Sequence, residues 1–418
     1  MKHFKLTTGA LLLSTALANS AFAATELAMW YHGAGNEVES AIINQIITDF
    51  NNSQSDYTIA LESFPQGAYN DAVQAAALAG NLPDIIDVDG PVMPGWAWAG
   101  YIAPLPIDEA EFADFLPGTK GIWNGTLYSI GLWDAAVALY ARQSTLDELG
   151  LRKPTLDAPW TKDEFMAALD AAKASGKYDY ALDLGTAWTG EWFPYAFSPF
   201  LQSFGGDMID RASYSTAEGA LNGDAALEFG AWWQGLFTGG YAQATQDGAD
   251  RDTGFNTSKY AFSWNGNWAA IPTLEQVNDV VFLPAPDLGN GSKIGAASWQ
   301  FGVTTTSKHP DGAAAFIKFA TQDKYLAAFS DGIGLIPSTA SAAAMTKNYS
   351  SGGALEVFYG LSEAQALVRP VTPGYAVVAK VFEKALADIA NGADVADTLD
   401  AAVDEIDADI AKNNGYSK

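Results

Sequence analysis

The sequence predicts an α/β fold in which parallel strands are covered by helices. Residues 26–88 alternate strand-like and helix-like patterns, which is typical of a parallel sheet flanked by helices. The length of 418 residues predicts two lobes with separate cores. Apolar residues make up 49% of the chain and cysteine is absent, so hydrophobic cores, and not disulfides, must stabilise it.

The first half of the alternation is the clearest. After the first strand, Asn36 is expected to cap a helix, with Glu39 completing a capping box. Pro83 precedes the third strand, and ligands of such sheets bind beyond the carboxyl ends of the strands. The strands are predicted at residues 26–31, 57–62 and 85–88, the helices at 36–50 and 69–79, and the strand ends at 32–36, 62–67 and 87–91.

The later elements are marked by caps and periodicity. Thr161, with Glu164 three residues later, predicts a capped helix, and Ser307 is expected to cap another helix with Pro310 near its start. Residues 265–268 predict a loop, because Asn and Gly disfavour regular structure. Further helices are predicted at residues 161–175, 225–237, 375–390 and 395–411, and a single strand at 293–306.

The N-terminal segment predicts the compartment. Lys2 and Lys5 precede an apolar stretch over residues 6–18 that is short for a membrane span, and Ala21-Phe22-Ala23 fits a cleavage site. Residues 1–23 therefore predict a cleaved signal peptide and a mature protein in the periplasm. The alternative is an uncleaved N-terminal anchor.

The charge and the aromatic content limit the ligand. A net charge of −27 repels nucleic acid, anionic lipid and anionic ligands, although it is also typical of an adaptation for solubility. Thirteen tryptophans and seventeen tyrosines are many for this length, and flat rings pack well against the C–H faces of sugars. We expect a neutral sugar ligand, no nucleic-acid partner, no cofactor and no metal.

Short segments along the whole chain resemble one family. Together, in this order and spacing, they are similar to extracellular solute-binding proteins of the maltose-binding type (family 1), the sugar receptors of ABC importers. The segments are residues 27–30, the small-residue helix, Gly and Pro-Asp of 76–86, 100–105, 139–142, 160–165, Ser-Phe-Gly-Gly at 203–206, the segment ending Gly-x-Trp at 261–268, and the Arg-Pro element at 368–373.

The resemblance implies a two-lobed periplasmic binding protein fold, type II-like, in which each lobe is a mainly parallel sheet flanked by helices. The lobes enclose the sugar and close by a hinge motion. The implied partner is the membrane permease of the importer, and a monomer is expected. The implied crossings lie near residues 133–140, 295–303 and 353–358. The lobes implied are residues 24–133 with 300–355, and residues 134–299 with 356–418.

The resemblance also implies ligand-binding residues. Trp268 corresponds to the tryptophan that stacks on a sugar ring, and the alternative is a core tryptophan. Asp134 corresponds to an acid that hydrogen-bonds sugar hydroxyls, and the alternative is a cap. Ala34-Gly35 replaces a charged pair typical of maltose-selective members, which argues against maltose. The further candidates are Asn265, Trp264, the acidic and aromatic pair Glu191 and Trp192, Trp299, Arg369, Asp89, His32 and Gly33.

Enzymatic function has little support in the sequence. It contains no zinc motif, no P-loop and no Gly-x-Ser-x-Gly element, so we predict no catalytic residue. Two alternatives stay open: a secreted glycoside-acting enzyme with a carboxylate pair, and a structural or adhesive envelope protein. The sugar itself is also open, since trehalose, sucrose, another α-glucoside, a monosaccharide, a polyol or a longer oligosaccharide all fit this reasoning.

Overall fold

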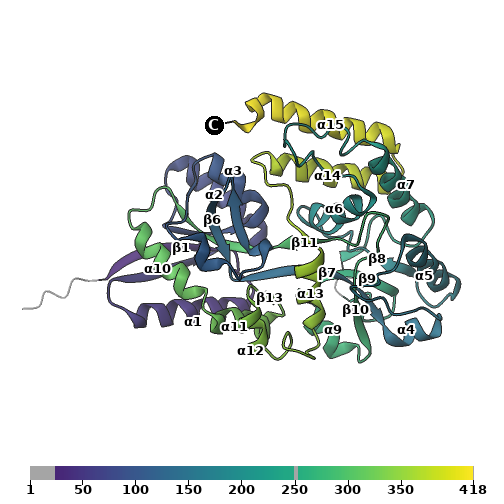
Figure 1. The fold of residues 1–418 in the computed structure, drawn as a ribbon, viewed down its shortest axis with the longest axis horizontal. Coiled ribbons are helices and arrows are strands. Elements are labelled where there is room, and N and C mark those ends of the chain that lie inside the picture. The colour runs from purple at the N-terminus through teal and green to yellow at the C-terminus, as the bar shows by residue number, and fades with distance from the viewer. Residues whose placement is uncertain (1–23, 249–252, 418) are drawn as a thin grey trace, which may run out of the picture.

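The computed structural model describes residues 24–248 and 253–417, so the predicted signal peptide, residues 1–23, lies outside the described residues. The chain forms two seven-stranded sheets, each flanked by helices, which lie beside one another in Figure 1. The predicted two-lobed α/β architecture is thereby confirmed, but the prediction of parallel sheets was wrong in part: both sheets are mixed, and the pairs in the second are mostly antiparallel. Among the described residues, no helix combines the length and apolar character needed to cross a membrane.

The first lobe is built on strands in the order β2-β1-β3-β12-β6-β5, with β4 beside β12. Strands β1, β2 and β3 are parallel, whereas β12 returns antiparallel to β3 and β6. The strands are β1 Thr25–Tyr31, β2 Tyr57–Ser63, β3 Ile85–Asp89, β4 Ile102–Ala103, β5 Lys120–Trp123, β6 Thr126–Gly131 and β12 Trp299–Thr304. The helices are α1 Glu37–Ser53, α2 Gln66–Ala79, α3 Met93–Trp98, α10 Pro310–Ala320, α11 Asp323–Ile333 and α12 Ala340–Met345, with 3₁₀ turns η1 Gly90–Val92, η2 Glu109–Phe112 and η3 Pro117–Thr119.

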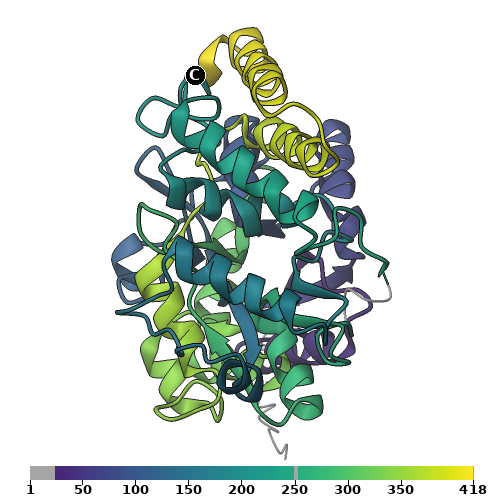
Figure 2. The same cartoon turned by 90° about the vertical axis from the view of Figure 1, so that its right-hand side faces the viewer.

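The second lobe is built on strands in the order β14-β11-β7-β9-β8, with β10 and β13 also pairing with β7. Its strands are β7 Trp133–Arg142, β8 Tyr180–Asp183, β9 Tyr260–Gly266, β10 Val280–Leu283, β11 Ile294–Ala297, β13 Ile336–Pro337 and β14 Ala366–Leu367. Its helices are α4 Gln143–Glu148, α5 Lys162–Ala174, α6 Trp192–Phe204, α7 Asp224–Thr238, α9 Ala270–Gln276, α13 Glu356–Gln365, α14 Tyr375–Ala390 and α15 Val395–Lys412, with 3₁₀ turns η4 Asn267–Ala269 and η5 Asn414–Tyr416. Figure 2 shows α14 and α15 packed together at one end of the molecule.

Local sequence signals account for several helix boundaries. Asn36 accepts a hydrogen bond from the amide of Glu39 at the start of α1, but the Glu39 carboxylate accepts from the side chain of Asn36 and not from its backbone amide, so the predicted capping box is incomplete. Thr161 and Glu164 form the predicted capping box at the start of α5. The hydroxyl of Ser307, however, donates to Asp84, and α10 begins at Pro310, so the prediction that Ser307 caps this helix was wrong. Proline suits the first helical position because an N–H there would have no acceptor within the helix, so its absence costs no hydrogen bond.

Two predictions about β structure were also wrong. Residues 293–306 form two strands in different sheets, β11 and β12, because the chain changes sheet at Ser298, whose hydroxyl donates to the carbonyl of Trp133. Residues 265–268 do not form a loop, since Asn265 and Gly266 end β9 and Asn267 and Trp268 open η4. Cross-strand pairing of Asn265 with Ala138 overrides its low strand propensity.

The chain passes between the lobes in extended strands at β7 and between β11 and β12, and through α12 and turns in the third passage. Ala135 of β7 packs in the core of the first lobe and Ala136 packs in that of the second. After β12, Ala342 still packs in the first core, whereas Tyr349 and Leu355 pack in the second, ahead of the lobe boundary predicted at residue 355. The two sheets are thus joined at β7, at Ser298 and in the region after β13.

Replacing Thr161 with Ala should lower the free energy of unfolding by about 1 kcal/mol, because the amide of Glu164 at the start of α5 loses its side-chain acceptor, the Thr161 hydroxyl. Urea denaturation measures the change. The matched control is Thr48→Ala, which removes the same atoms from an exposed position inside α1 and should cost little. Equal losses in the two variants would contradict the capping role.

Candidate functional site

Polar and aromatic side chains gather where strands of both lobes end. His32 follows β1, and Asp89 is the last residue of β3. Trp299 begins β12 and pairs directly with Asp89 across the antiparallel ladder. In the second lobe, β9 ends at Gly266, and Trp268 follows it. The carboxyl ends of parallel strands are the usual ligand position in such sheets.

His32 is the centre of a buried cluster in the first lobe. Its ring stacks on Trp299, with ring centroids 3.8 Å apart and an interplanar angle of 10°. Its Nδ1 is hydrogen-bonded to the carboxylate of Asp87, and its Nε2 lies 3.5 Å from Oε1 of Glu39. Tyr31 donates to the same Glu39 oxygen at 2.5 Å. Burial lowers the pKa of His32, but the neighbouring carboxylates outweigh it and raise this pKa above its usual value.

Gly33 brings the start of α1 against this cluster. A Cβ at this position would lie 2.6 Å from the ring of Tyr31, so the turn requires glycine. Its carbonyl accepts a hydrogen bond from the Ser40 hydroxyl in α1. Gly33 therefore has a structural role beside the site.

Arg369 joins the two lobes. Only 4% of this residue is exposed. Its Nη1 donates to Oε2 of Glu191 in the second lobe, and its Nη2 lies 3.6 Å from Oδ1 of Asp89 in the first. The hydroxyl of Tyr375 donates to the same Glu191 oxygen at 2.5 Å. The guanidinium also lies 5.3 Å from the ring centre of Tyr195. One buried cation therefore holds carboxylates from both lobes.

The ionisation of Asp89 reflects its burial. Burial raises the pKa of this carboxyl from 3.8 to about 7, while Arg369 acts in the opposite direction and Glu191 reinforces the rise. A buried carboxyl that shares one guanidinium with a second carboxylate is only partly stabilised in its charged form.

An aromatic cluster occupies the second-lobe side. Trp268 is half-buried and packs against the cores of both lobes. Its ring centroid lies 6.0 Å from that of Trp188, 6.1 Å from that of Trp192 and 6.0 Å from that of Tyr195. Trp192 is buried, and its indole N–H donates to the carbonyl of Leu184. The half-buried indole of Trp268 is therefore surrounded by three other aromatic rings.

Asn267 fixes the position of Trp268. This side chain is fully buried, accepts from the amide of Ala136 in β7 at 3.0 Å and donates to the carbonyl of Gly334 at 2.7 Å. The preceding carbonyl, that of Gly266, accepts from the Tyr140 hydroxyl at 2.6 Å. The backbone that carries the indole is therefore tied to β7 and to the segment before β13.

Three predicted site residues make contacts within the second lobe. Trp264 is 2% exposed in the core of the second lobe, where its indole N–H donates to the carbonyl of Ala196. Asp134 is fully buried in β7 and accepts from the Ser362 hydroxyl and its neighbour's amide, so its packing corresponds to a structural role. Asn265 accepts from the amide of Gly266 at the end of β9. These contacts argue against direct ligand contact by Trp264 and Asp134.

The structure adds residues that the sequence reasoning missed. Tyr195 lies one helical turn after Trp192 in the aromatic segment, and that spacing was the available signal. Tyr375 begins α14 and reaches Glu191, and no sequence pattern indicated that contact. The remaining additions are Trp188, Glu39 and Asp87.

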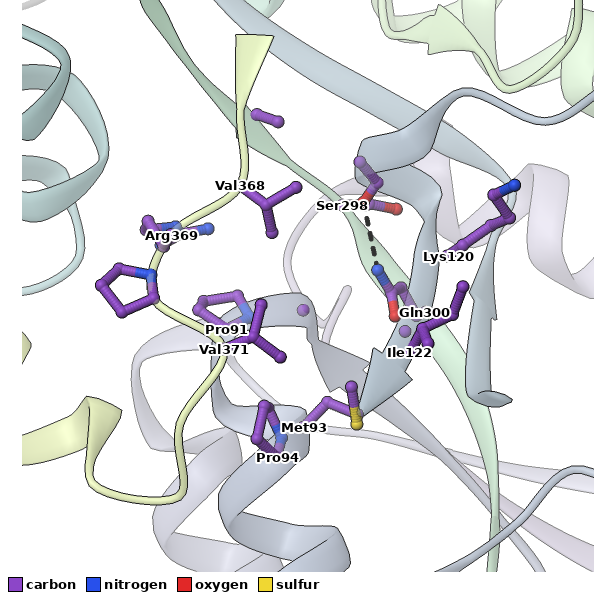
Figure 3. A pocket seen from close by; sticks show the side chains of 15 residues that line it. Pro91, Met93, Pro94, Lys120, Ile122, Ser298, Gln300, Val368, Arg369 and Val371 are labelled. Atoms are coloured by element: carbon purple, nitrogen blue, oxygen red, sulfur yellow. Dashed lines mark hydrogen bonds between the residues drawn. The ribbon is translucent and has the colours of Figure 1, made fainter. Parts of the chain in front are cut away.

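A cavity of about 30 Å³ lies beside Arg369, between the lobes. Figure 3 shows Val368 and Val371 on one side of it and Ser298 and Gln300 on the other. This volume suits a water molecule and is far below the roughly 300–1,000 Å³ of ligand pockets. The cavity in this conformation is therefore not a sugar site.

Comparison with known proteins identifies the relatives of this chain. A family model described as bacterial extracellular solute-binding protein matches residues 45–357. The sn-glycerol-3-phosphate-binding periplasmic protein of Brucella melitensis is 27% identical over 374 residues, covering 81% of this chain and 80% of the relative. The mannitol-binding protein of Pseudomonas aeruginosa is 26% identical over 269 residues, covering 61% of this chain and 60% of the relative.

A solved structure has the same fold. The sugar-binding protein MalE of Xanthomonas citri superposes with a TM-score of 0.79 at 18% identity, covering 93% of this chain and 98% of that protein. At this identity the similarity concerns the fold alone. It matches the two sheets flanked by helices described above.

Replacing Asp89 with Asn should change how stability depends on pH. Because the folded-state pKa is raised, the native protein keeps a proton between about pH 4 and pH 7 that the unfolded chain releases. The free energy of unfolding of the wild type should therefore fall relative to that of Asp89→Asn as the pH rises through this window, and the difference should level off above it. Urea titrations of both proteins from pH 4 to pH 8.5 measure the difference. A constant difference over this range would mean that Arg369 keeps Asp89 ionised throughout.

Proposed function

This chain belongs to the bacterial extracellular solute-binding protein family, and we propose that its ligand is a neutral di- or oligosaccharide of the α-glucoside type. It is the solute-binding component of an ABC sugar transporter and not an enzyme. In this proposal the sugar binds between the two lobes in the periplasm and is delivered to a membrane permease. We also propose that residues 1–23 are a cleaved signal peptide and that the mature protein is a monomer.

The position of Trp268 carries the proposal. The half-buried indole contacts the cores of both lobes and stands beside three other aromatic rings. Aromatic rings pack against the C–H face of a sugar, while neighbouring carboxylate and amide oxygens accept hydrogen bonds from its hydroxyls. Trp299, stacked on His32 at the strand ends of the first lobe, offers a second aromatic surface.

The charges at the strand ends favour an uncharged ligand. Glu39, Asp87, Asp89 and Glu191 face Arg369 and His32, so acidic groups outnumber basic ones. A relative binds sn-glycerol 3-phosphate and another binds mannitol, by their names. Of these two chemistries, the uncharged polyol suits this set of side chains better than the anion.

A thermal-shift screen tests the function. The purified protein is heated with a panel of neutral sugars and polyols that includes trehalose, sucrose, maltose and mannitol. Stabilisation by a member of the panel, recovered chemically unchanged, supports the proposal. Cleavage of the sugar would indicate a glycoside-acting enzyme, and no response to any member would contradict sugar binding.

Replacing Trp268 with Ala should weaken binding of the sugar found by the screen by about 30- to 150-fold. Burial of an indole against a sugar ring contributes roughly 2–3 kcal/mol, and each 1.4 kcal/mol is tenfold in affinity. Calorimetric titration measures the affinity and thermal melting checks the fold.

The matched control is Trp264→Ala, the same substitution four positions earlier. Trp264 is buried in the core, so its loss should cost about 3–5 kcal/mol of folding stability. If Trp268→Ala instead loses stability on that scale, or keeps its affinity, Trp268 is not the stacking surface.

Saturation with that sugar should reduce the radius of gyration measured by small-angle X-ray scattering, because the lobes are joined by extended segments at Asp134 and beside Trp299 that allow hinge closure. Trp268→Ala at the same sugar concentration serves as the control and should show a smaller reduction. An unchanged radius of gyration in the saturated wild type would count against closure.

A further inference from the structure

The charge of Arg369 is already compensated within the protein. Its two terminal nitrogens face Glu191 and Asp89, one from each lobe. The Tyr375 hydroxyl completes the set by donating to the Glu191 carboxylate. A buried guanidinium is stable only with such partners, so above pH 7, where Asp89 is ionised, the three charged groups form one unit.

This unit lies next to the aromatic cluster. The guanidinium carbon lies 5.3 Å from the ring centre of Tyr195, and the Tyr195 ring lies 6.0 Å from that of Trp268. A ligand that stacks on Trp268 therefore binds close to Arg369. Among the described side chains, none accepts a hydrogen bond from the buried Nε of Arg369.

Arginine is the side chain best suited to bind phosphate and carboxylate groups, through two parallel N–H donors. Here Nη1 donates to the carboxylate of Glu191, and Nη2 lies at ion-pair distance, 3.6 Å, from that of Asp89. An anionic ligand would have to displace them, and it would then leave Asp89 buried without its partner. An uncharged hydroxyl group carries no charge to be repelled by these carboxylates.

We propose that Asp89 and Glu191 determine the charge class of the ligand: by compensating Arg369, they exclude phosphate esters and other anions and leave the site selective for uncharged hydroxylated molecules. The inference deepens the proposed function and rests on it for the position of the ligand beside Trp268. It assigns to the two acids a role in specificity that is separate from any direct contact with the sugar.

The test is a gain of anion binding. The double variant Asp89→Asn/Glu191→Gln keeps the size of both side chains and removes their charges, so Arg369 becomes free to hold an anion. Calorimetric titration at pH 8 and low ionic strength should show inorganic phosphate binding at least tenfold more tightly to the variant than to the wild type. The same is expected for α-glucose 1-phosphate, whereas methyl α-glucoside should show no such gain.

Three further variants make the result specific. Adding Arg369→Gln to the double variant should abolish the gain, because the anion then has no guanidinium. Glu111→Gln/Glu228→Gln removes two exposed, lysine-paired acids, one from each lobe, and should leave phosphate binding as in the wild type. Glu191→Gln alone, whose side chain is 39% exposed, should fold even if the double variant does not, and should show a smaller gain in the same direction.

The inference is overturned if the wild type binds phosphate as tightly as the double variant, if neither Glu191→Gln nor the double variant gains affinity, or if the gain survives Arg369→Gln. Inorganic phosphate contains no sugar, so these outcomes are independent of the sugar screen. A wild type that ignores every neutral sugar contradicts the proposed function, whereas an absent phosphate gain in a sugar-binding protein contradicts only this inference.

Discussion

The structure depends on a few buried hydrogen bonds that hold the segments crossing between the lobes. Extended chain that leaves one sheet for another loses its ladder partners, and its backbone groups must find others. Ser298 donates to the carbonyl of Trp133, and Ser338 donates to that of Gly131, where the chain changes sheet. The side chain of Asn267 accepts from an amide of β7 and donates to a carbonyl before β13. Small polar side chains fit these places because each satisfies one or two groups without adding bulk, and the lobes can therefore meet closely at their strand ends.

Close approach of the lobes in turn explains the buried charges. Asp89 ends a strand in the first lobe, whereas Glu191 precedes a helix of the second lobe, to which the segment that carries Arg369 also belongs. Arg369, on the segment that leads into α14, reaches both. The lobes are thus held by the ion pair between Arg369 and Asp89 as well as by apolar contacts. This arrangement suits movement, because water hydrates the charged groups favourably when the lobes separate, whereas exposing apolar surface to water costs free energy.

Local sequence patterns predicted the elements well and the contacts poorly. The helix at residues 375–390 and the capping box at Thr161 follow from short-range periodicity and hydrogen bonding, which need no tertiary context. The division of residues 293–306 between two sheets was missed, because a strand-forming run looks the same whichever sheet it joins. Trp264 and Trp268 are four positions apart in one segment and are equally aromatic, yet one lies in the core and the other is half-buried at the site. Arg369 and Glu191 are 178 positions apart, so only the fold shows that they pair.

The same stretch of backbone presents the indole and ties the crossing segments. Asn267 is covalently adjacent to Trp268, and its side chain spans β7 and the carbonyl of Gly334. The Tyr349 hydroxyl donates to that same carbonyl, so the segment in which the chain re-enters the second lobe is hydrogen-bonded to the same group. The proposed ligand, packed on this indole, would therefore contact the backbone segment that is hydrogen-bonded to the crossings. Because protein interiors are close-packed, a displacement of this segment would be transmitted to β7 and to the residues before β13. In the proposed function, ligand contact at Trp268 and the geometry of the crossing segments therefore depend on one set of hydrogen bonds.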